Sequence, residues 1–378
     1  MATIFGTRPE AIKLAPLLME LSRRKDEVRS SVVVTAQHRD MLDQVLRTFR
    51  IRPGRDLNLM RPGQSPAEVT ARILAELEPV LHRLRPDVVV VQGDTATTFA
   101  AAMASFLGRI PVAHVEAGLR TSDMYNPFPE EMCRRLTTSL STLHLAPTAL
   151  SKRNLLAEGV SPRNIVVSGN TVIDALFWTL RNRRPPRSGV LPPEMPGRML
   201  LVTTHRRENF NRPLGNICRA ILTLVREVPD LHVVLPLHRN PNVDRPVRDV
   251  LEGRERIALL PPLDYIPFVH LMSRAHLILT DSGGVQEEAP SLGVPVLVAR
   301  RTTERPEGID AGVARLVGTE EGAIVREALG LLRSEARWRR MARKANPYGD
   351  GKASVRIVDE LLERFTPVVR PPKRGRSS

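Results

Sequence analysis

The sequence predicts an α/β protein made of two Rossmann-like, doubly wound domains that face each other across a cleft. Short apolar runs alternate with segments of helical period from one end of the chain to the other. Most of these runs are β-branched and apolar on both faces, which is typical of parallel strands covered by helices on both sides. The chain has 378 residues, more than one hydrophobic core usually serves, so two domains are expected.

Twelve apolar runs are the expected strands, because each is short, β-branched and bounded by polar or turn-forming residues. They cover residues 2–6, 30–36, 87–94, 111–117, 143–147, 164–169, 198–205, 231–238, 256–262, 276–281, 295–300 and 314–318. Helical periodicity is clear between them, for example over residues 67–84 and 214–228. Repeated β-α units of this kind predict parallel sheets.

The domain boundary is expected in residues 181–198, which are rich in Pro, Gly and Arg and have no period. This linker separates a first domain at 1–180 from a second domain at 199–365. The last helical segment, 355–365, is expected to pack back on the first domain. Residues 366–378 form a basic tail that is expected to be disordered.

The composition limits the classes of partner. The formal net charge is +15, but only six of the 56 basic residues are lysines and the arginines are scattered. We therefore attribute the charge to coding composition and a polyphosphate-like small substrate rather than to nucleic acid. Aromatic residues make up only 4% of the chain, which argues against a stacking platform for single strands.

Other features point to a cytoplasmic protein without a metal. No apolar run approaches the length of a membrane span, and the first ten residues lack the pattern of a signal peptide. Cys133 and Cys218 have no ligand spacing, and no histidines or acids are spaced as metal ligands. We therefore expect no membrane partner and no metal site.

The stretch "TDSGGVQEEAPSLGVPVL", residues 280–297, predicts a diphosphate site where a strand turns into a helix. Asp281, Ser282, Gly283 and Gly284 form the turn, where unpaired backbone N–H groups and small residues allow a phosphate to approach. One of the two following glutamates can reach ribose hydroxyls. The alternative is an ordinary tight turn with two solvated glutamates. No G-x-G-x-x-G opens the first helix and no P-loop is present, so nicotinamide and P-loop chemistry are not expected.

Charged residues recur at the predicted strand ends, where they could do acid/base work on a bound anion. Each has a structural alternative: a helix cap for Asp94, a buried pair with Arg120 for Glu116, a helix start for Glu130. His205 could be structural, and Arg8 could pair with Glu10. The candidates are Arg8, Lys13, Asp94, Glu116, Glu130, Arg134 and His205.

Ten ordered motifs resemble those of the non-hydrolysing bacterial UDP-N-acetylglucosamine 2-epimerases. They are "GTRPEAIKLAPL", "QGDTATT", "HVEAGLRT", "PFPEEMCRR", "GNTVIDAL", "HRREN", "DYIPFVHLM", "TDSGGVQEEAPSLGVPVLV", "TTERPEG" and "NPYGDGKAS". The resemblance extends from Phe5 to about Phe365. It implies a glycosyltransferase-B-like fold and interconversion of UDP-GlcNAc and UDP-ManNAc without a cofactor. The alternative hypotheses are a hydrolysing epimerase, a retaining glycosyltransferase and a catalytically inactive nucleotide-sugar sensor.

The resemblance also implies roles for individual residues. Asp94, Glu116 and Glu130 match acid/base carboxylates, and His205 with Arg8 matches diphosphate contacts. The remaining substrate-binding matches are Lys13, Arg134, Phe268 for uracil, Ser282, Gly283 and Gly284 for the diphosphate, Glu288 for ribose and Arg305 for the phosphates.

Two further expectations come from the resemblance. We expect this chain to form a homodimer. Bacterial family members bind a second UDP-GlcNAc as an activator, and the matching residues are Gln37, His38, Gln44 and His238. Two departures stand out: the first strand is shorter than usual, and Gly63 lies in a segment that carries arginine in the family.

Overall fold

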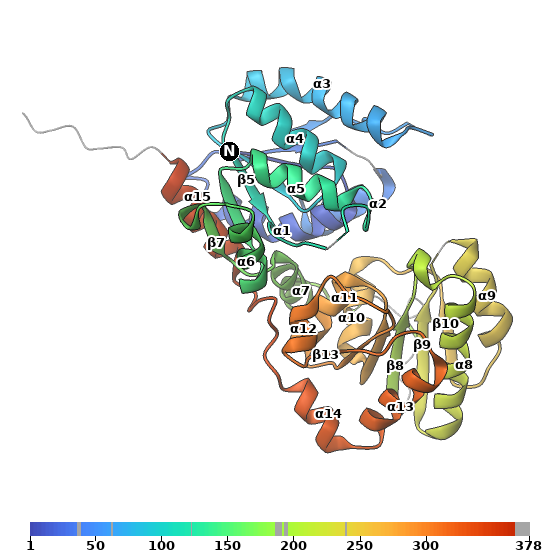
Figure 1. Ribbon diagram of the computed structural model, residues 1–378. Helices are drawn as coiled ribbons and strands as arrows, with labels where there is room; N and C mark the ends of the chain where they lie inside the picture. The colour runs from blue at the N-terminus through green and yellow to red at the C-terminus, as the bar shows by residue number, and fades with distance from the viewer. Residues whose placement is uncertain are drawn as a thin grey trace, which may run out of the picture. The chain divides into compact units, whose positions relative to one another are not determined.

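The computed structural model describes residues 1–35, 39–61, 63–121, 123–185, 191–192, 196–238 and 240–366. The chain forms two compact units, shown in Figure 1. The first unit comprises Met1–Ser168 and the segment that begins at Ser354, and the second comprises Gly169–Ala353. Each unit is built around one parallel sheet, as the apolar runs predict.

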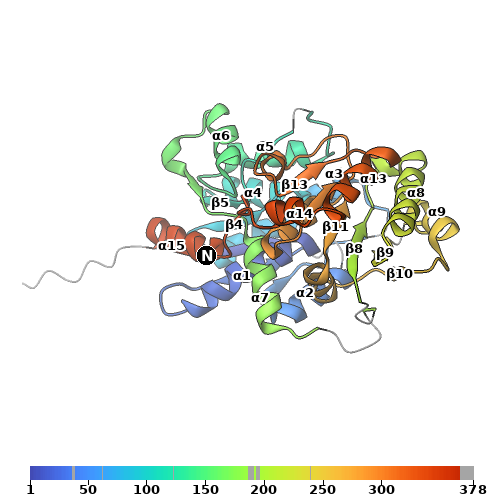
Figure 2. The same cartoon turned by 90° about the horizontal axis from the view of Figure 1, so that it is seen from below.

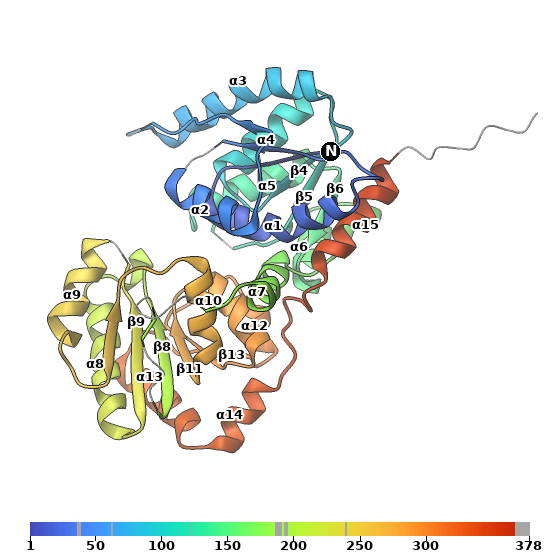
Figure 3. The ribbon, with the colours of Figure 1, turned by 180° about the vertical axis from the view of Figure 1, so that it is seen from behind.

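The first unit contains a seven-stranded parallel sheet in the order β3-β2-β1-β4-β5-β6-β7. Helices α3, α4 and α5 lie on one face of the sheet and α1 and α2 on the other (Figures 1 and 3). Its strands are β1 Ala2–Phe5, β2 Ser31–Val34, β3 Arg55–Asp56, β4 Val89–Gln92, β5 Val112–Val115, β6 Leu143–Ala146 and β7 Ile165–Val167. Its helices are α1 Arg8–Arg23, α2 Arg39–Phe49, α3 Pro66–Leu84, α4 Ala96–Leu107, α5 Glu130–Leu140, α6 Ala149–Ala157, the 3-10 turn η1 Pro162–Asn164 and α15 Ala353–Phe365.

The second unit contains a six-stranded parallel sheet in the order β10-β9-β8-β11-β12-β13. Helices α8, α9 and α13 bury a common core against one face of it, and α8 and α9 lie side by side in Figures 2 and 3. Its strands are β8 Arg198–Thr203, β9 Leu231–Pro236, β10 Ile257–Leu260, β11 Leu277–Thr280, β12 Val296–Val298 and β13 Ala314–Leu316. Its helices are α7 Thr171–Asn182, η2 Arg207–Asn209, α8 Arg212–Glu227, α9 Pro241–Leu251, α10 Tyr265–Arg274, α11 Gly283–Glu288, η3 Ala289–Leu292, α12 Pro306–Asp310, α13 Glu321–Leu332 and α14 Glu335–Ala342.

All twelve predicted strands are present, and the structure adds β3. Strand β3 has only two residues, both exposed and charged, so it has no apolar run by which it could be predicted. In both sheets the strand order reverses direction at one point, between β1 and β4 and between β8 and β11. Loops diverge at such a switch point, and ligands of open α/β sheets bind there.

The unit boundaries differ from the predicted domain boundaries of 1–180 and 199–365. Helix α7, which we assigned to the first domain, packs against α10 and α11 of the second unit. Just before this helix, Asn170 donates to Glu287 at 3.2 Å, and just after it the Arg183 carbonyl lies 3.0 Å from His270 Nε2. The composition of residues 181–198 indicates a connection, but packing decides which unit a helix joins.

Helix α15 packs on the first unit, as predicted. Arg24 at the end of α1 pairs with Asp359 of α15 at 2.6 Å, and Arg364 donates to the Arg163 carbonyl at 2.6 Å. The predicted basic tail lies outside the described residues beyond Thr366. Across the described ranges, no helix is both long and apolar enough to cross a membrane.

Gly118, just after β5, allows a close approach that any side chain would block. Its φ is +90°, and an added Cβ would overlap the Ser151 carbonyl oxygen and lie 2.9 Å from Leu155 Cγ. Gly159 has a similar φ of +84° but nothing within 4 Å of an added Cβ. Comparing substitutions at these two glycines therefore separates the cost of backbone strain from the cost of steric overlap.

We expect Gly118→Ala to lower the free energy of unfolding by about 3 kcal/mol or more, from left-handed strain plus overpacking. Gly159→Ala should cost only the strain, roughly 1–2 kcal/mol. Urea unfolding followed by circular dichroism measures both. Equal losses in the two variants would show that the contact with Ser151 carries no cost.

Candidate functional site

Glu116 lies at the carboxyl end of β5, in a backbone conformation that is rare for a side-chain-bearing residue. Its φ is +64° and its exposure is 8%. Lys13 Nζ of α1 lies 2.5 Å from Glu116 Oε1, and the Gln92 amide donates to Oε2. Such strained, over-determined positions cluster at active sites. Both carboxylate oxygens are therefore oriented by donors from two other segments.

Asp94 follows β4 and forms an ion pair with Arg134 of α5. Arg134 is 5% exposed and also donates to Glu131 at 3.0 Å. Glu130 is the first residue of α5. Burial, together with the charges of Asp94 and Glu130, raises the pKa of the Cys133 thiol to about 11. Asp94 and Glu130 thus share one neighbourhood around Cys133.

The turn that carries Asp94 is held by a neutral histidine. Burial lowers the pKa of His114 to about 3. The imidazole is therefore uncharged at neutral pH, and its Nε2, 2.7 Å from the Gly93 carbonyl, is the donor. This bond joins the end of β4 to β5 one residue before Asp94.

The structural alternatives for two of these carboxylates are wrong. The cap of α4 is Thr95, whose hydroxyl accepts from Thr98 N at 3.1 Å, so Asp94 is not the cap. Arg120 pairs with Glu158 at 2.6 Å instead of Glu116. Glu130 does begin a helix, as its alternative proposed.

In the second unit, His205 follows β8 and contacts Asp281, which follows β11. Asp281 is fully buried, and its Oδ1 lies 3.1 Å from His205 Nδ1. The same carboxylate accepts from the backbone N–H groups of His205 and Arg206 and from the Asn209 amide, each at 3.0 Å. Burial alone would raise the pKa of Asp281, but these bonds and the His205 charge hold that pKa below its usual value. His205 is thereby held in one orientation, and its ring stacks on His238 with centroids 5.9 Å apart.

The predicted diphosphate turn begins α11, with Ser282 as the N-cap residue and Gly283 as the first helical residue. Neither Gly283 nor Gly284 has a positive φ, so backbone strain does not explain the glycines. An added Cβ at Gly283 would lie 3.3 Å from Cζ of Arg305. Gly283 therefore leaves the space that the Arg305 side chain occupies.

Glu287 and Glu288 are not solvated, so the alternative of an ordinary exposed turn is wrong. Glu288 is 6% exposed and accepts from the Tyr265 hydroxyl at 2.7 Å. Glu287 is 1% exposed and pairs with Arg305 at 2.8 Å. Arg305 also pairs with Glu304 at 3.4 Å. This network connects the turn to the segment that precedes α12.

The other predicted residues are placed as follows. Phe268 is half-buried on α10, Arg8 is the half-buried first residue of α1, and Gln44 is half-buried on α2. His238 follows β9, and burial lowers its pKa. Gln37 and His38 lie outside the described residues. Among the residues described, no cluster of three His, Cys, Asp or Glu could hold a metal ion.

Sequence reasoning missed the contacts that orient the predicted residues, although it did include Asp281 in the predicted turn. Gln92 contacts Glu116, Asp281 contacts His205, and Tyr265 contacts Glu288. Asp281 and Gln92 do stand at strand ends, the position that pointed to the other candidates. Tyr265 follows no such rule, because only folding brings the start of α10 to α11.

The chain is similar in sequence to known proteins over nearly its full length. The family model described as UDP-N-acetylglucosamine 2-epimerase matches residues 20–362. The chain is 53% identical to UDP-N-acetylglucosamine 2-epimerase of Yersinia pestis over 95% of its length and 97% of the relative. It is 51% identical to the Escherichia coli K12 enzyme of that name, with the same coverage.

Solved structures resemble the chain over nearly its full length. UDP-GlcNAc 2-epimerase from Neisseria meningitidis bound to UDP-GlcNAc has a TM-score of 0.90 and 48% identity, covering 96% of this chain and 99% of its own. The Methanocaldococcus jannaschii enzyme in complex with UDP-GlcNAc and UDP has a TM-score of 0.80 and 35% identity, with the same coverage.

Proposed function

The chain belongs to the UDP-N-acetylglucosamine 2-epimerase family, and we propose that it interconverts UDP-GlcNAc and UDP-ManNAc by inverting carbon 2 of the sugar. The observation that carries this proposal is the group of oriented carboxylates at the ends of β4 and β5. Glu116 is held by Lys13 and Gln92, and Asp94 is held by Arg134. A retaining glycosyltransferase would not need these carboxylates, so we favour the epimerase.

The chemistry requires elimination before the proton moves. The hydrogen on carbon 2 is not acidic, because no carbonyl group activates it. Breaking the bond from carbon 1 to UDP creates cationic character next to that hydrogen and makes it labile. Loss of the proton gives a glycal and UDP, and re-addition of UDP with protonation from the opposite face inverts carbon 2. These steps need acid/base groups, a stabilised leaving diphosphate and exclusion of water.

We assign these tasks to the two units. Asp94, Glu116 and Glu130 of the first unit supply the acid/base groups. The diphosphate is bound by cations and turn residues, and Phe268 stacks on uracil while Glu288 binds ribose. The proposed diphosphate contacts are Arg8, His205, Ser282, Gly283, Gly284 and Arg305. Lys13 and Arg134 are further proposed substrate-binding residues.

We further propose that a second UDP-GlcNAc acts as an activator. Gln44 and His238 are the described residues that would contact it. The stacking of His238 on His205 supports this proposal, because a ligand that moves one ring must affect the other.

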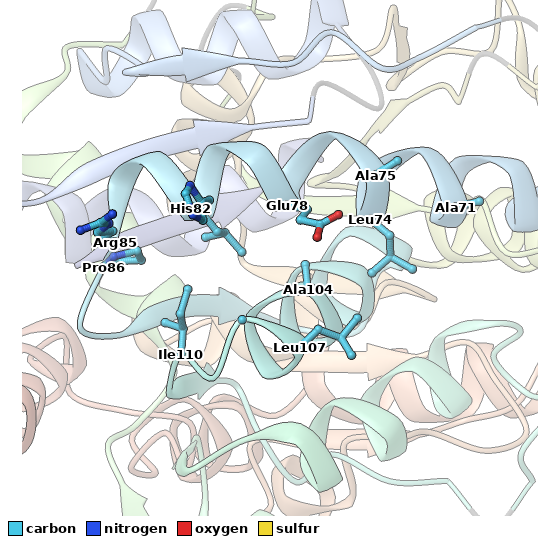
Figure 4. Close-up of a pocket in the computed structure, with 12 residues that line it drawn as sticks. Ala71, Leu74, Ala75, Glu78, His82, Arg85, Pro86, Ala104, Leu107 and Ile110 are labelled. Atoms are coloured by element: carbon cyan, nitrogen blue, oxygen red, sulfur yellow. The ribbon is translucent and has the colours of Figure 1, made fainter.

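A homodimer is the third part of the proposal. Figure 4 shows an apolar groove of about 730 Å³ between α3 and α4, lined by Leu74, Ala75, Leu107 and Ile110 among others. Leu107 is 66% exposed and the adjacent Phe106 57% exposed. Exposed apolar patches of this kind mark protein interfaces. We propose that a second copy of the chain covers this surface.

Incubation of UDP-GlcNAc with the protein in deuterium oxide tests the reaction. We expect UDP-ManNAc that carries deuterium at carbon 2, with no NAD or metal added, measured by NMR and mass spectrometry. Glu116→Gln should lower turnover by about 100-fold or more, the scale of a lost acid or base. Glu158→Gln, which removes the partner of Arg120, is the matched control and should keep normal turnover.

Two results would contradict the proposal. Product without deuterium would exclude proton exchange with solvent. Release of free ManNAc as the first product would identify a hydrolysing enzyme.

Titration calorimetry with UDP and pyrophosphate tests the turn. Gly283→Val should weaken UDP binding, because the side chain displaces the Arg305 guanidinium that lies 3.3 Å from an added Cβ. Glu288→Ala should weaken UDP binding but leave pyrophosphate binding nearly unchanged, since Glu288 binds ribose. A lost charge-assisted bond of about 1.5–3 kcal/mol corresponds to roughly ten- to a hundred-fold in affinity. The control is Gly322→Val, where an added Cβ meets nothing within 4 Å. If folded Gly283→Val and Glu288→Ala both bind UDP as tightly as the parent, this turn is not the nucleotide-binding site.

Light scattering after size exclusion tests the homodimer. We expect Leu107→Arg to convert a dimer into a monomer, because it places a charge in a buried apolar interface. Leu156→Arg, at a residue of α6 that is 38% exposed, should leave the dimer intact. A monomeric parent, or a Leu107→Arg variant that stays dimeric, would refute this interface.

A further inference from the structure

Glu10 is a buried carboxylate to which neither the family resemblance nor the roles assigned above give a task. It lies in the first turn of α1 and is 1% exposed. Five donors from two separate loops contact its two oxygens. A buried charge is costly unless it is fully hydrogen-bonded, so this arrangement has a specific physical basis.

Each carboxylate oxygen of Glu10 forms hydrogen bonds with one of the two loops. Oε2 accepts from Gly6 N at 3.1 Å, Thr7 N at 2.7 Å and Thr7 Oγ1 at 2.7 Å, all in the loop between β1 and α1. Oε1 accepts from Thr95 Oγ1 at 2.8 Å and lies 3.1 Å from Thr98 Oγ1, whose single proton is shared with the Gln92 carbonyl oxygen at 2.7 Å, at the start of α4. The carboxylate thus lies at the N-termini of two helices, whose dipoles favour a negative charge.

The two loops carry different parts of the proposed site. The first leads into α1, which bears Arg8 and Lys13, and Lys13 in turn contacts Glu116. The second contains Asp94, the residue before Thr95. Strands β1 and β4 are neighbours at the switch point of the sheet, where their loops diverge. Glu10 is the side chain that bonds to both loops at that point.

Helix α4 does not need Glu10 as an N-cap. Thr95 already caps that helix by accepting from Thr98 N. Burial raises the pKa of Glu10, while hydrogen bonds from Thr7, Thr95 and the backbone oppose that rise. A buried carboxyl group that contacts both loops is therefore explained better by the link between the loops than by helix capping alone.

We propose that Glu10 is a positioning residue. It fixes the position of the turn that carries Asp94 relative to helix α1, which bears Arg8 and Lys13. It touches no reacting atom in this proposal. It acts through the placement of Asp94 relative to the Lys13–Glu116 pair. The inference rests on the proposed epimerase function, because only that function requires these groups to act together.

The test uses the full chain and two neighbouring threonines of α4. Thr97 and Thr98 are both fully buried, but only Thr98 contacts Glu10, while the Thr97 hydroxyl lies 2.9 Å from that of Thr35. Thr98 also donates to the Gln92 carbonyl, so Glu10→Gln is the primary variant and Thr98→Val the supporting one. We expect Glu10→Gln and Thr98→Val to lower kcat about 10- to 100-fold, the scale of a small misplacement of catalytic groups. KM should change less than kcat, because most of the nucleotide contacts assigned above lie in the second unit and are intact, although Arg8 belongs to the first unit. Thr97→Val should keep parental kcat.

The double variant Glu10→Gln/Thr98→Val tests whether the two single variants lose kcat through one shared link or through independent defects. If both residues act through one link, its kcat should equal that of Glu10→Gln alone, whereas independent defects multiply. Thermal unfolding of each variant is measured alongside. The inference is overturned if kcat is unchanged in folded Glu10→Gln, or if Thr97→Val and Thr98→Val lose kcat equally. A parent without any epimerase activity would instead refute the proposed function.

Discussion

The structure depends on the reversal of strand order in each sheet, between β1 and β4 and between β8 and β11. At these points two loops leave a sheet in opposite directions, and backbone N–H groups face a space that no helix fills. A buried carboxylate occupies each point. Glu10 bonds to the loops after β1 and β4, and Asp281 bonds to the loop after β8. Each acid converts a cluster of unpaired donors into a rigid junction.

Rigid junctions explain why the charged groups of the candidate site hold defined positions. Glu116 keeps a left-handed backbone because Lys13 and Gln92 fix its two oxygens, and the strain is offset by those contacts. Asp94 is more exposed but is held by the buried Arg134, which Glu131 holds in turn. The groups available for chemistry are thus oriented by buried partners, which is how an active site avoids reorganisation during reaction.

The second unit orients its polar groups by a different arrangement. Glu304 accepts hydrogen bonds from Arg206 and Arg300 and forms an ion pair with Arg305. Although burial opposes it, these cations hold the pKa of Glu304 at about 2. The carboxylate therefore stays charged and fixes the arginines at neutral pH. A unit rich in fixed cations at the end of its sheet is suited to a diphosphate, whereas the first unit presents carboxylates at the corresponding edge.

The sequence by itself determined the fold class, the twelve longer strands and the residues at their carboxyl ends, because period and strand-end position are local properties of the chain. It could not predict β3, which has no apolar run, or the membership of α7, which follows from packing against α10 and α11. It also left the partners of the strand-end residues open. Only the tertiary structure decided that Arg120 pairs with Glu158 and that Tyr265 holds Glu288, because such pairs join segments far apart in sequence and form where packed elements bring them within hydrogen-bond distance.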